Sequence, residues 1–198
     1  MAQSAASRNG RIWRAGAVPV AKSGIGPQRP VNRANERERV GNLAVRIEGE
    51  ERRGRWLVTC DHASNHVPAW VNGGDLGIPT EDMARHIAWD VGAAGVASEL
   101  GKLLDSPVIL SDFSRLVIDP NRGEDDPTLV MKLYDGTIIP ANRHAGAEEV
   151  ERRLDRLYRP YHAAYARLAA LRPDRVIVAV HSFTPCLRGR AERPWHVG

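Results

Sequence analysis

The sequence predicts an α/β protein, a three-layer α/β/α sandwich in which helices cover both faces of a mostly parallel sheet. From about residue 43 onward, short apolar runs typical of strands alternate with longer segments whose apolar residues recur at helical spacing. Residues 175–180 form a continuous apolar run, as strands do when both faces of a parallel sheet are buried. The length of 198 residues suits one domain with its own core.

Four short segments carry the strand pattern ahead of residues 175–180. Residues 43–47 and 56–60 are apolar runs bounded by glycine and charged residues, which predicts two strands. Residues 108–110 and 116–118 have the same character and predict two more.

Two longer segments carry the helix pattern. Thr80 is a candidate N-cap, because two acidic residues that suit the positive end of a helix dipole follow it. We expect this helix to run to about residue 104, ahead of Pro107. A second helix is predicted over residues 150–168, and Pro160 should kink or divide it. On the first helix, the side chains expected to face the core are Met83, Ile87, Val91 and Leu100.

The charge of the chain is unevenly distributed, which divides the sequence into two parts. Residues 1–40 contain eight basic and two acidic side chains, whereas the net charge of the whole chain is only +4. We therefore expect residues 1–42 to be a disordered basic extension and residues 43–198 to form the α/β domain. Residues 194–198 resemble the entry to another strand, so we expect the domain to be truncated at its C-terminus.

Composition excludes several classes of partner. The domain itself has no basic excess, so we expect no nucleic-acid partner. No apolar run approaches the ~20 residues that a membrane span needs. Two cysteines, Cys60 and Cys186, are too few for a disulfide framework and indicate a reducing, cytoplasmic compartment. The sequence does not indicate an oligomeric state.

The strongest chemical signal is a pair of histidines that directly follow predicted strands. His62 follows the strand at 56–60, and His181 follows the strand at 175–180. Ligands of open α/β sheets bind outside the carboxyl ends of the strands, and neutral imidazole is a common zinc ligand. The pair therefore indicates one shared metal site. The alternative is that each histidine only satisfies backbone groups of its own loop.

Arginines flank the predicted strand at 116–118. Arg115 precedes it, and Asn121 and Arg122 follow it. Guanidinium groups bind carboxylates through two parallel hydrogen bonds, so this arrangement suits an acidic or carbonyl-bearing substrate. An ion pair at the surface between Asp119 and Arg122 explains the same spacing equally well.

Asp90 is the third candidate ligand. It lies four residues after His86, so the two would share one face of a helix and could pair. Its neighbours are apolar, and a buried carboxylate needs a cation, a metal or hydrogen-bond donors around it. Asn142, in a predicted turn, is a further residue that could reach the site. The two cysteines lack the close spacing of a structural zinc site and are left out.

Taken together, the ordered motifs resemble the N-formylglutamate amidohydrolase family over about residues 55–198. This family is similar in fold to zinc carboxypeptidases and aspartoacylases, which are α/β/α sandwiches with one zinc ion. The resemblance therefore implies a Zn²⁺-dependent hydrolase. The motifs that carry it lie at residues 60–68, 86–90, 114–122, 134–142 and 181–185.

The resemblance also implies roles for individual residues. His62 and His181 would be metal ligands, with Asp90 as the third, because Asn65 stands where the wider group has a glutamate ligand. Arg115 would face the carbonyl oxygen of the substrate and act in catalysis together with Asp90. The acidic residue that serves the family as general base lies in a segment beyond residue 198. The residues expected to bind substrate are Asn65, Asn121, Arg122, Asn142 and Ser182.

The leading functional hypothesis is zinc-dependent hydrolysis of the N-formyl or N-acyl amide of an acidic amino acid. For an N-formylglutamate-like substrate the products are formate and the amino acid, a reaction of histidine degradation. The alternative is a truncated, non-catalytic protein that binds a metal or a small carboxylate-bearing molecule. A third hypothesis makes the domain a scaffold whose basic extension recruits an anionic partner.

Overall fold

The computed structural model describes residues 44–194. The predicted basic extension at 1–42, residue 43 and residues 195–198 lie outside this range.

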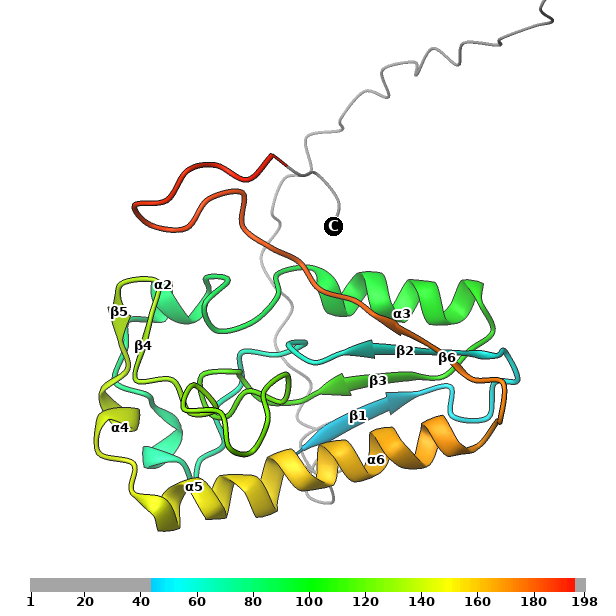
Figure 1. Cartoon of the computed structure of the whole chain (residues 1–198), viewed down its shortest axis with the longest axis horizontal. Coiled ribbons are helices and arrows are strands. Elements are labelled where there is room, and N and C mark those ends of the chain that lie inside the picture. The colour runs from blue at the N-terminus through cyan, green and yellow to red at the C-terminus, as the bar shows by residue number, and fades with distance from the viewer. Residues whose placement is uncertain (1–43, 195–198) are drawn as a thin grey trace, which may run out of the picture.

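A four-stranded sheet forms the centre of the domain (Figure 1). The strand β2 (Trp56–Cys60) pairs in parallel with β3 (Val108–Ser111) on one side and with β6 (Val176–Ala179) on the other, whereas β1 (Val45–Glu48) pairs antiparallel with β3. The sheet is therefore mostly parallel, and four of the five predicted strands are confirmed. In spatial order the strands are β1, β3, β2 and β6.

Helices cover both faces of this sheet, which confirms the α/β/α sandwich (Figure 1). The helix α3 (Ala93–Leu103) lies on one face. A long helix lies on the other face and consists of α5 (Ala147–Arg153), a π-helical turn η2 (Leu154–Tyr158) and α6 (Arg159–Ala170). None of the helices within residues 44–194 is both long and apolar enough to cross a membrane.

The helix α3 packs closely on the sheet because its buried face consists of small residues. Ala93, Ala97 and Gly101 recur every four residues along that face and are buried. A Cβ atom at Gly101 would lie only 2.1 Å from Cγ2 of Val108 on β3. Glycine at this position therefore sets how near the helix can approach the strand.

Short elements lie around the end of the sheet to which the three parallel strands point (Figure 1). Two of these elements form a tight hairpin, in which Asp135 and Gly136 have φ angles of 44° and 79°. These elements are η1 (Asn72–Gly74), α2 (Thr80–Met83), β4 (Leu133–Tyr134), β5 (Thr137–Ile138) and α4 (Pro140–Arg143).

The prediction of one helix from Thr80 to about residue 104 is wrong. The helix α2 ends at Met83, turns follow, and α3 begins only after Gly92, whose φ of 82° lies in the left-handed region. Between the two helices, the backbone carbonyl of Ala88 accepts from the backbone N–H of Arg115 at 3.2 Å. Because backbone groups of this segment bond to other segments rather than to the next helical turn, the chain leaves the helix here. Val91, expected to face inward, is 53% exposed; Ile87 is buried, and Met83 and Leu100 are partly buried.

The prediction of a strand at residues 116–118 is also wrong. These residues are fully buried, but they form a turn followed by irregular backbone and pair with no strand of the described sheet. The three residues are apolar because they lie in the main core, and not because they belong to a strand.

The strand β6 is confirmed, but it is not buried on both faces. It lies at one edge of the described sheet, where β2 is its neighbour. Its side chains alternate between partly buried and exposed, and Ile177 is 48% exposed.

The helix predicted over residues 150–168 is confirmed and begins slightly earlier, at Ala147. Pro160 lies in the first turn of α6, directly after the π-helical turn. Since proline has no N–H to donate, the change of hydrogen-bond register before it divides the helix without ending it.

A buried polar pair connects the long helix to the irregular segment after β3. Arg153, almost fully buried, donates from Nη1 to the carbonyl of Val117 and to Oδ1 of Asn142, each at 2.8 Å. Asn142 in turn donates from Nδ2 to the carbonyls of Leu116 and Met131, each at 2.7 Å. These bonds satisfy carbonyl groups that no strand partner reaches.

We expect Asn142→Ala to lower the free energy of unfolding by about 3 kcal/mol, because two buried carbonyls and Arg153 lose their partner. Urea denaturation measures this change. Arg143→Ala, at the exposed neighbouring position on α4, is the control and should change stability by less than about 0.5 kcal/mol. Equal losses in the two variants would contradict the structural role of Asn142.

Candidate metal and active site

His62 and His181 meet at the carboxyl ends of adjacent parallel strands. Each lies two residues after the end of its strand, β2 for His62 and β6 for His181. Their ring centroids are 5.2 Å apart, and the planes are tilted by 58°. The prediction that two imidazoles distant in sequence share one location is confirmed.

Asp90 lies between the two histidines and Arg115. Its Oδ2 is 2.9 Å from Nδ1 of His181 and 3.4 Å from Nδ1 of His62, while its Oδ1 accepts a hydrogen bond from Nη2 of Arg115. The backbone N–H of Ser182 also donates to Oδ2, at 3.3 Å. The carboxylate is buried, and the loop before α3 delivers it.

Two further carboxylates contact the opposite sides of the imidazole rings. Oδ1 of Asp119 is 2.7 Å from Nε2 of His62, and Oδ2 of Asp61 is 3.8 Å from Nε2 of His181. The hydroxyl of Tyr161 on α6 donates to Oδ1 of Asp61 at 2.5 Å. Both rings therefore have a carboxylate at Nε2 and Asp90 at Nδ1.

These contacts shift the pKa values of the buried groups. Burial disfavours the charged form of His62, but hydrogen bonds to Asp119 and Asp90 outweigh burial and raise the pKa of His62. Burial likewise disfavours the charged form of Asp90. Hydrogen bonds from His181 and His62, together with the charge of Arg115, outweigh it and hold the pKa of Asp90 well below its ordinary value.

The donor set fits a divalent metal ion. One atom each from His62, Asp90 and His181 lie within 4.8 Å of one another. Two imidazoles and one carboxylate are the ligands of many catalytic zinc sites, which keep a further position open. In its neutral form with the proton on Nε2, His62 would donate to Asp119 and turn the lone pair of Nδ1 toward Asp90, which is the arrangement that a metal ion between the two groups requires.

Arg115, to which the resemblance assigns a catalytic role, lies beside Asp90. Its guanidinium is nearly buried and bonds to Asp90 through Nη2. Its Nε–H is buried and has no hydrogen-bond partner within residues 44–194. An unused donor beside the candidate metal ligands can bind an oxygen of a substrate.

Asn121 and Arg122 are exposed and lie two and three residues after Asp119. Nε of Arg122 is 3.8 Å from Oδ2 of Asp119, and its side chain is 48% exposed. The backbone N–H of Asn121 donates to Oδ1 of Asp119 at 2.9 Å. The alternative of an ion pair at the surface is only half right, because Asp119 itself is buried against His62.

The other predicted substrate-binding residues divide into two kinds. Asn65 is exposed and donates from Nδ2 to the carbonyl of Met83 at 2.9 Å, and Ser182 contacts Asp90 through its backbone. Asn142 is fully buried and donates from its amide to two backbone carbonyls. Asn142 was predicted to contact the substrate because it lies in a predicted turn. In the structure it lies in α4, and its side chain bonds to groups of the buried core instead.

The predicted pair of His86 and Asp90 does not form. The segment between them is not helical, so the two side chains diverge. Nε2 of His86 lies 3.4 Å from Oδ2 of Asp135 in the β4–β5 hairpin, and Asp90 contacts the two site histidines and Arg115.

Sequence reasoning missed Asp61 and Asp119 as members of the site. Asp61 directly precedes His62, and Asp119 ends the apolar run at 116–118. A carboxylate at the end of a buried segment was the available signal for both, but the partner of each lies on another segment.

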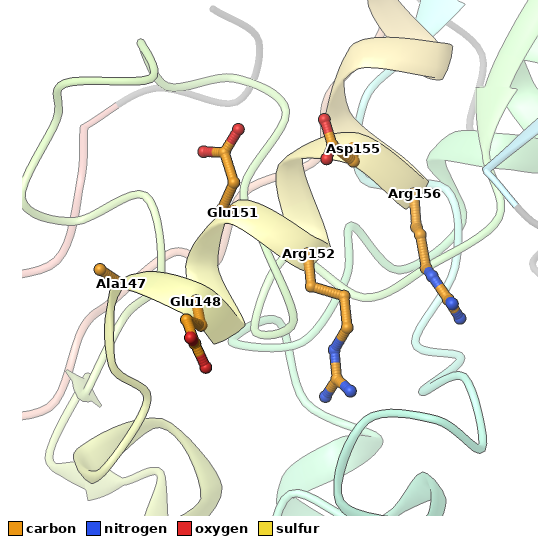
Figure 2. A pocket seen from close by; sticks show the side chains of 6 residues that line it. All are labelled: Ala147, Glu148, Glu151, Arg152, Asp155 and Arg156. Carbon is orange, nitrogen blue, oxygen red and sulfur yellow. The ribbon is translucent and has the colours of Figure 1, made fainter.

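A hollow of about 640 Å³ lies elsewhere, along α5 and η2 (Figure 2). In Figure 2, Arg152 and Arg156 extend to the same side of the helix. Their guanidinium groups lie 5.3 and 5.1 Å from the ring of Trp70. None of the candidate metal ligands lines this hollow, which is bordered by Ala147, Glu148, Glu151, Arg152, Asp155 and Arg156.

Comparison with known proteins identifies the family of this chain. A family model described as N-formylglutamate amidohydrolase matches residues 54–198. The chain belongs to this family. No curated protein matches the chain at a significant level.

Solved structures place this N-formylglutamate amidohydrolase family member among known folds. The crystal structure of the gene product Atu2144 from Agrobacterium tumefaciens is similar, with 34% sequence identity and a TM-score of 0.73. That match covers 79% of this chain but 62% of the other, so the chain spans less than two thirds of the length of that relative. The N-formylglutamate amidohydrolase from Ralstonia eutropha shares the fold at 22% identity and a TM-score of 0.53, covering 65% of this chain and 51% of that one.

The two thiols of the chain lie in opposite environments. Cys60 is fully buried under α3, and burial raises the pKa of its thiol to about 12. Cys186 is exposed, and its Sγ lies 3.1 Å from the carbonyl of Arg190.

We expect one thiol of the native protein to react with Ellman's reagent at pH 8, because a thiol whose pKa is about 12 stays protonated there and Cys60 is also shielded. In denaturant both thiols should react. Cys186→Ser should abolish the native reaction, whereas Cys60→Ser should leave it unchanged. A reactive Cys60 in the folded protein would contradict this burial.

Proposed function

We propose that this chain carries the catalytic site of a metal-dependent amidohydrolase. Its substrate is the N-formyl or N-acyl amide of an acidic amino acid, and its products from an N-formylglutamate-like substrate are formate and the amino acid. The observation that supports this most is the convergence of His62, Asp90 and His181 within 4.8 Å in a member of this family.

Zn²⁺ is the ion that we propose for this site, with His62, Asp90 and His181 as its ligands. Bound zinc acts as a Lewis acid and lowers the pKa of water to about 7, which supplies a nucleophile near neutral pH. Asp119 orients the ring of His62, and Asp61 lies beside the ring of His181, so that each presents Nδ1 to the site.

Arg115 is the residue that we propose to stabilise the carbonyl oxygen during hydrolysis. Its Nη2 is held by Asp90, which fixes the guanidinium, and its buried Nε–H is free to donate. A fixed donor of this kind stabilises negative charge as it develops on the oxygen. Asp90 thereby serves both the metal and the orientation of the catalytic arginine.

Arg122 and Asn121 are the residues that we propose to bind a carboxylate of the substrate. The side chain of Arg122 is half exposed. The nearby Asp119 contacts His62, one of the proposed metal ligands. A guanidinium at this position suits a carboxylate next to the cleaved amide. Asn65 and Ser182 remain candidates for further substrate contacts.

We also propose a cytoplasmic location, which the two free thiols support.

We expect zinc-loaded protein to release formate from N-formyl-L-glutamate and to lose this activity on treatment with a chelator. His62→Ala and His181→Ala should each lower the affinity for Zn²⁺ by at least about 100-fold, measured by calorimetry, and Asp119→Asn by about 10- to 100-fold. His66→Ala is the control, since this histidine lies in the same loop but is exposed. Zinc binding without turnover would favour the non-catalytic alternative, and unchanged affinity in His181→Ala would refute the site.

We expect Arg115→Met to lower kcat by about 10²- to 10³-fold, because the transition state loses its charged donor. Steady-state kinetics with N-formyl-L-glutamate measures this effect, and calorimetry checks that Zn²⁺ still binds. A normal kcat in a variant that retains zinc would remove Arg115 from the mechanism.

A further inference from the structure

The segment that carries Arg115, Asp119 and Arg122 has no strand partner within the described residues. Its backbone carbonyls therefore need other hydrogen-bond donors. The long helix on that face of the sheet supplies several of them, and it lies alongside this segment in Figure 1.

Two aromatic side chains of the helix hold the turn at residues 120–122. The hydroxyl of Tyr158 donates to the backbone carbonyl of Arg122 at 2.7 Å. Nε2 of His162 lies 3.0 Å from the carbonyl of Pro120, to which it donates. The two rings pack on each other with centroids 4.3 Å apart, so each supports the position of the other.

The placement of Tyr158 depends on the irregularity of the helix. Tyr158 is the last residue of the π-helical turn, is mostly buried, and faces the turn at 120–122. π-Helical turns inside α-helices are frequent at functional sites. Burial raises the pKa of Tyr158, so its hydroxyl remains a proton donor at neutral pH.

The side chain of Arg122, by contrast, is only loosely held. Its nearest acidic atoms are Oδ2 of Asp119 at 3.8 Å and Oδ2 of Asp126 at 3.9 Å, and it is half exposed. Exposed ion pairs of this length contribute little to the order of a side chain. The direction of the guanidinium therefore depends on how firmly the backbone of Arg122 is fixed.

We propose that Tyr158, supported by His162, is a positioning residue that sets the affinity of the site for a substrate carboxylate by fixing the backbone of Arg122. This inference rests on the proposed role of Arg122 in binding that carboxylate. Tyr158 acts through Arg122 and does not touch the substrate.

The test is a double-mutant cycle read by binding. Calorimetry measures the dissociation constant of L-glutamate, the product that retains the carboxylates, on zinc-loaded full-length protein, so the measurement does not depend on turnover. The variants are Tyr158→Phe, Arg122→Ala and the double variant. Tyr165→Phe is the matched control, because this tyrosine lies on the same helix and its hydroxyl has no hydrogen bond within residues 44–194.

We expect Arg122→Ala to weaken L-glutamate binding by at least about tenfold and Tyr158→Phe by about fivefold. The double variant should bind no more weakly than Arg122→Ala alone, because Tyr158 has no effect without the guanidinium that it positions. Tyr165→Phe should bind normally, and the affinity for Zn²⁺ should be the same in all variants.

Two results would overturn the inference while leaving the proposed function intact. One is normal binding by Tyr158→Phe when Arg122→Ala binds weakly. The other is a double variant in which the two losses multiply, as expected of a merely structural tyrosine. Normal binding by Arg122→Ala would instead refute the proposed carboxylate-binding role itself, and the role of Tyr158 with it.

Discussion

The carboxylate of Asp90 is the constraint on which the rest of the site depends. One of its oxygens bonds to Arg115, and the other faces His62 and His181. A carboxylate buried to this degree is stable only when cations or donors surround it. The three partners come from segments that are distant in sequence, so this single group fixes the loop before α3, the ends of β2 and β6 and the segment after β3 relative to one another.

The irregular segments of the chain follow from this constraint. A continuous helix through Asp90 would use its backbone groups in the helix itself, whereas the backbone N–H of Asp90 donates to the carbonyl of His62 at 2.9 Å. A strand after Arg115 would likewise need a neighbour in the sheet. Instead, Asn142 and side chains of the long helix donate hydrogen bonds to the backbone carbonyls of that segment. Regular elements supply the scaffold, and the site lies where they stop.

Much of the site could be predicted because its chemistry is local to strand ends. His62 and His181 each follow an apolar strand, and parallel strands bring their carboxyl ends to one edge of a sheet. Asp61 and Asp119 were missed as members of the site, because a carboxylate beside an imidazole is recognised only by its distance to the ring. Asn142 shows the reverse error. Its residue type suited a substrate contact, but the side chain is fully buried and donates to a backbone carbonyl of the core.

Local sequence patterns were enough to predict the α/β sandwich, four of its strands, the long helix and the residue types of a candidate metal site. Apolar periodicity and short motifs predict these features, because each depends only on a few neighbouring residues. Local patterns did not show where the first helix breaks, that residues 116–118 pair with no strand of the described sheet, or that β6 lies at its edge. They also did not show which nitrogen of each histidine faces Asp90. Those outcomes depend on which distant groups satisfy each backbone carbonyl and each buried charge, and no local pattern carries that information.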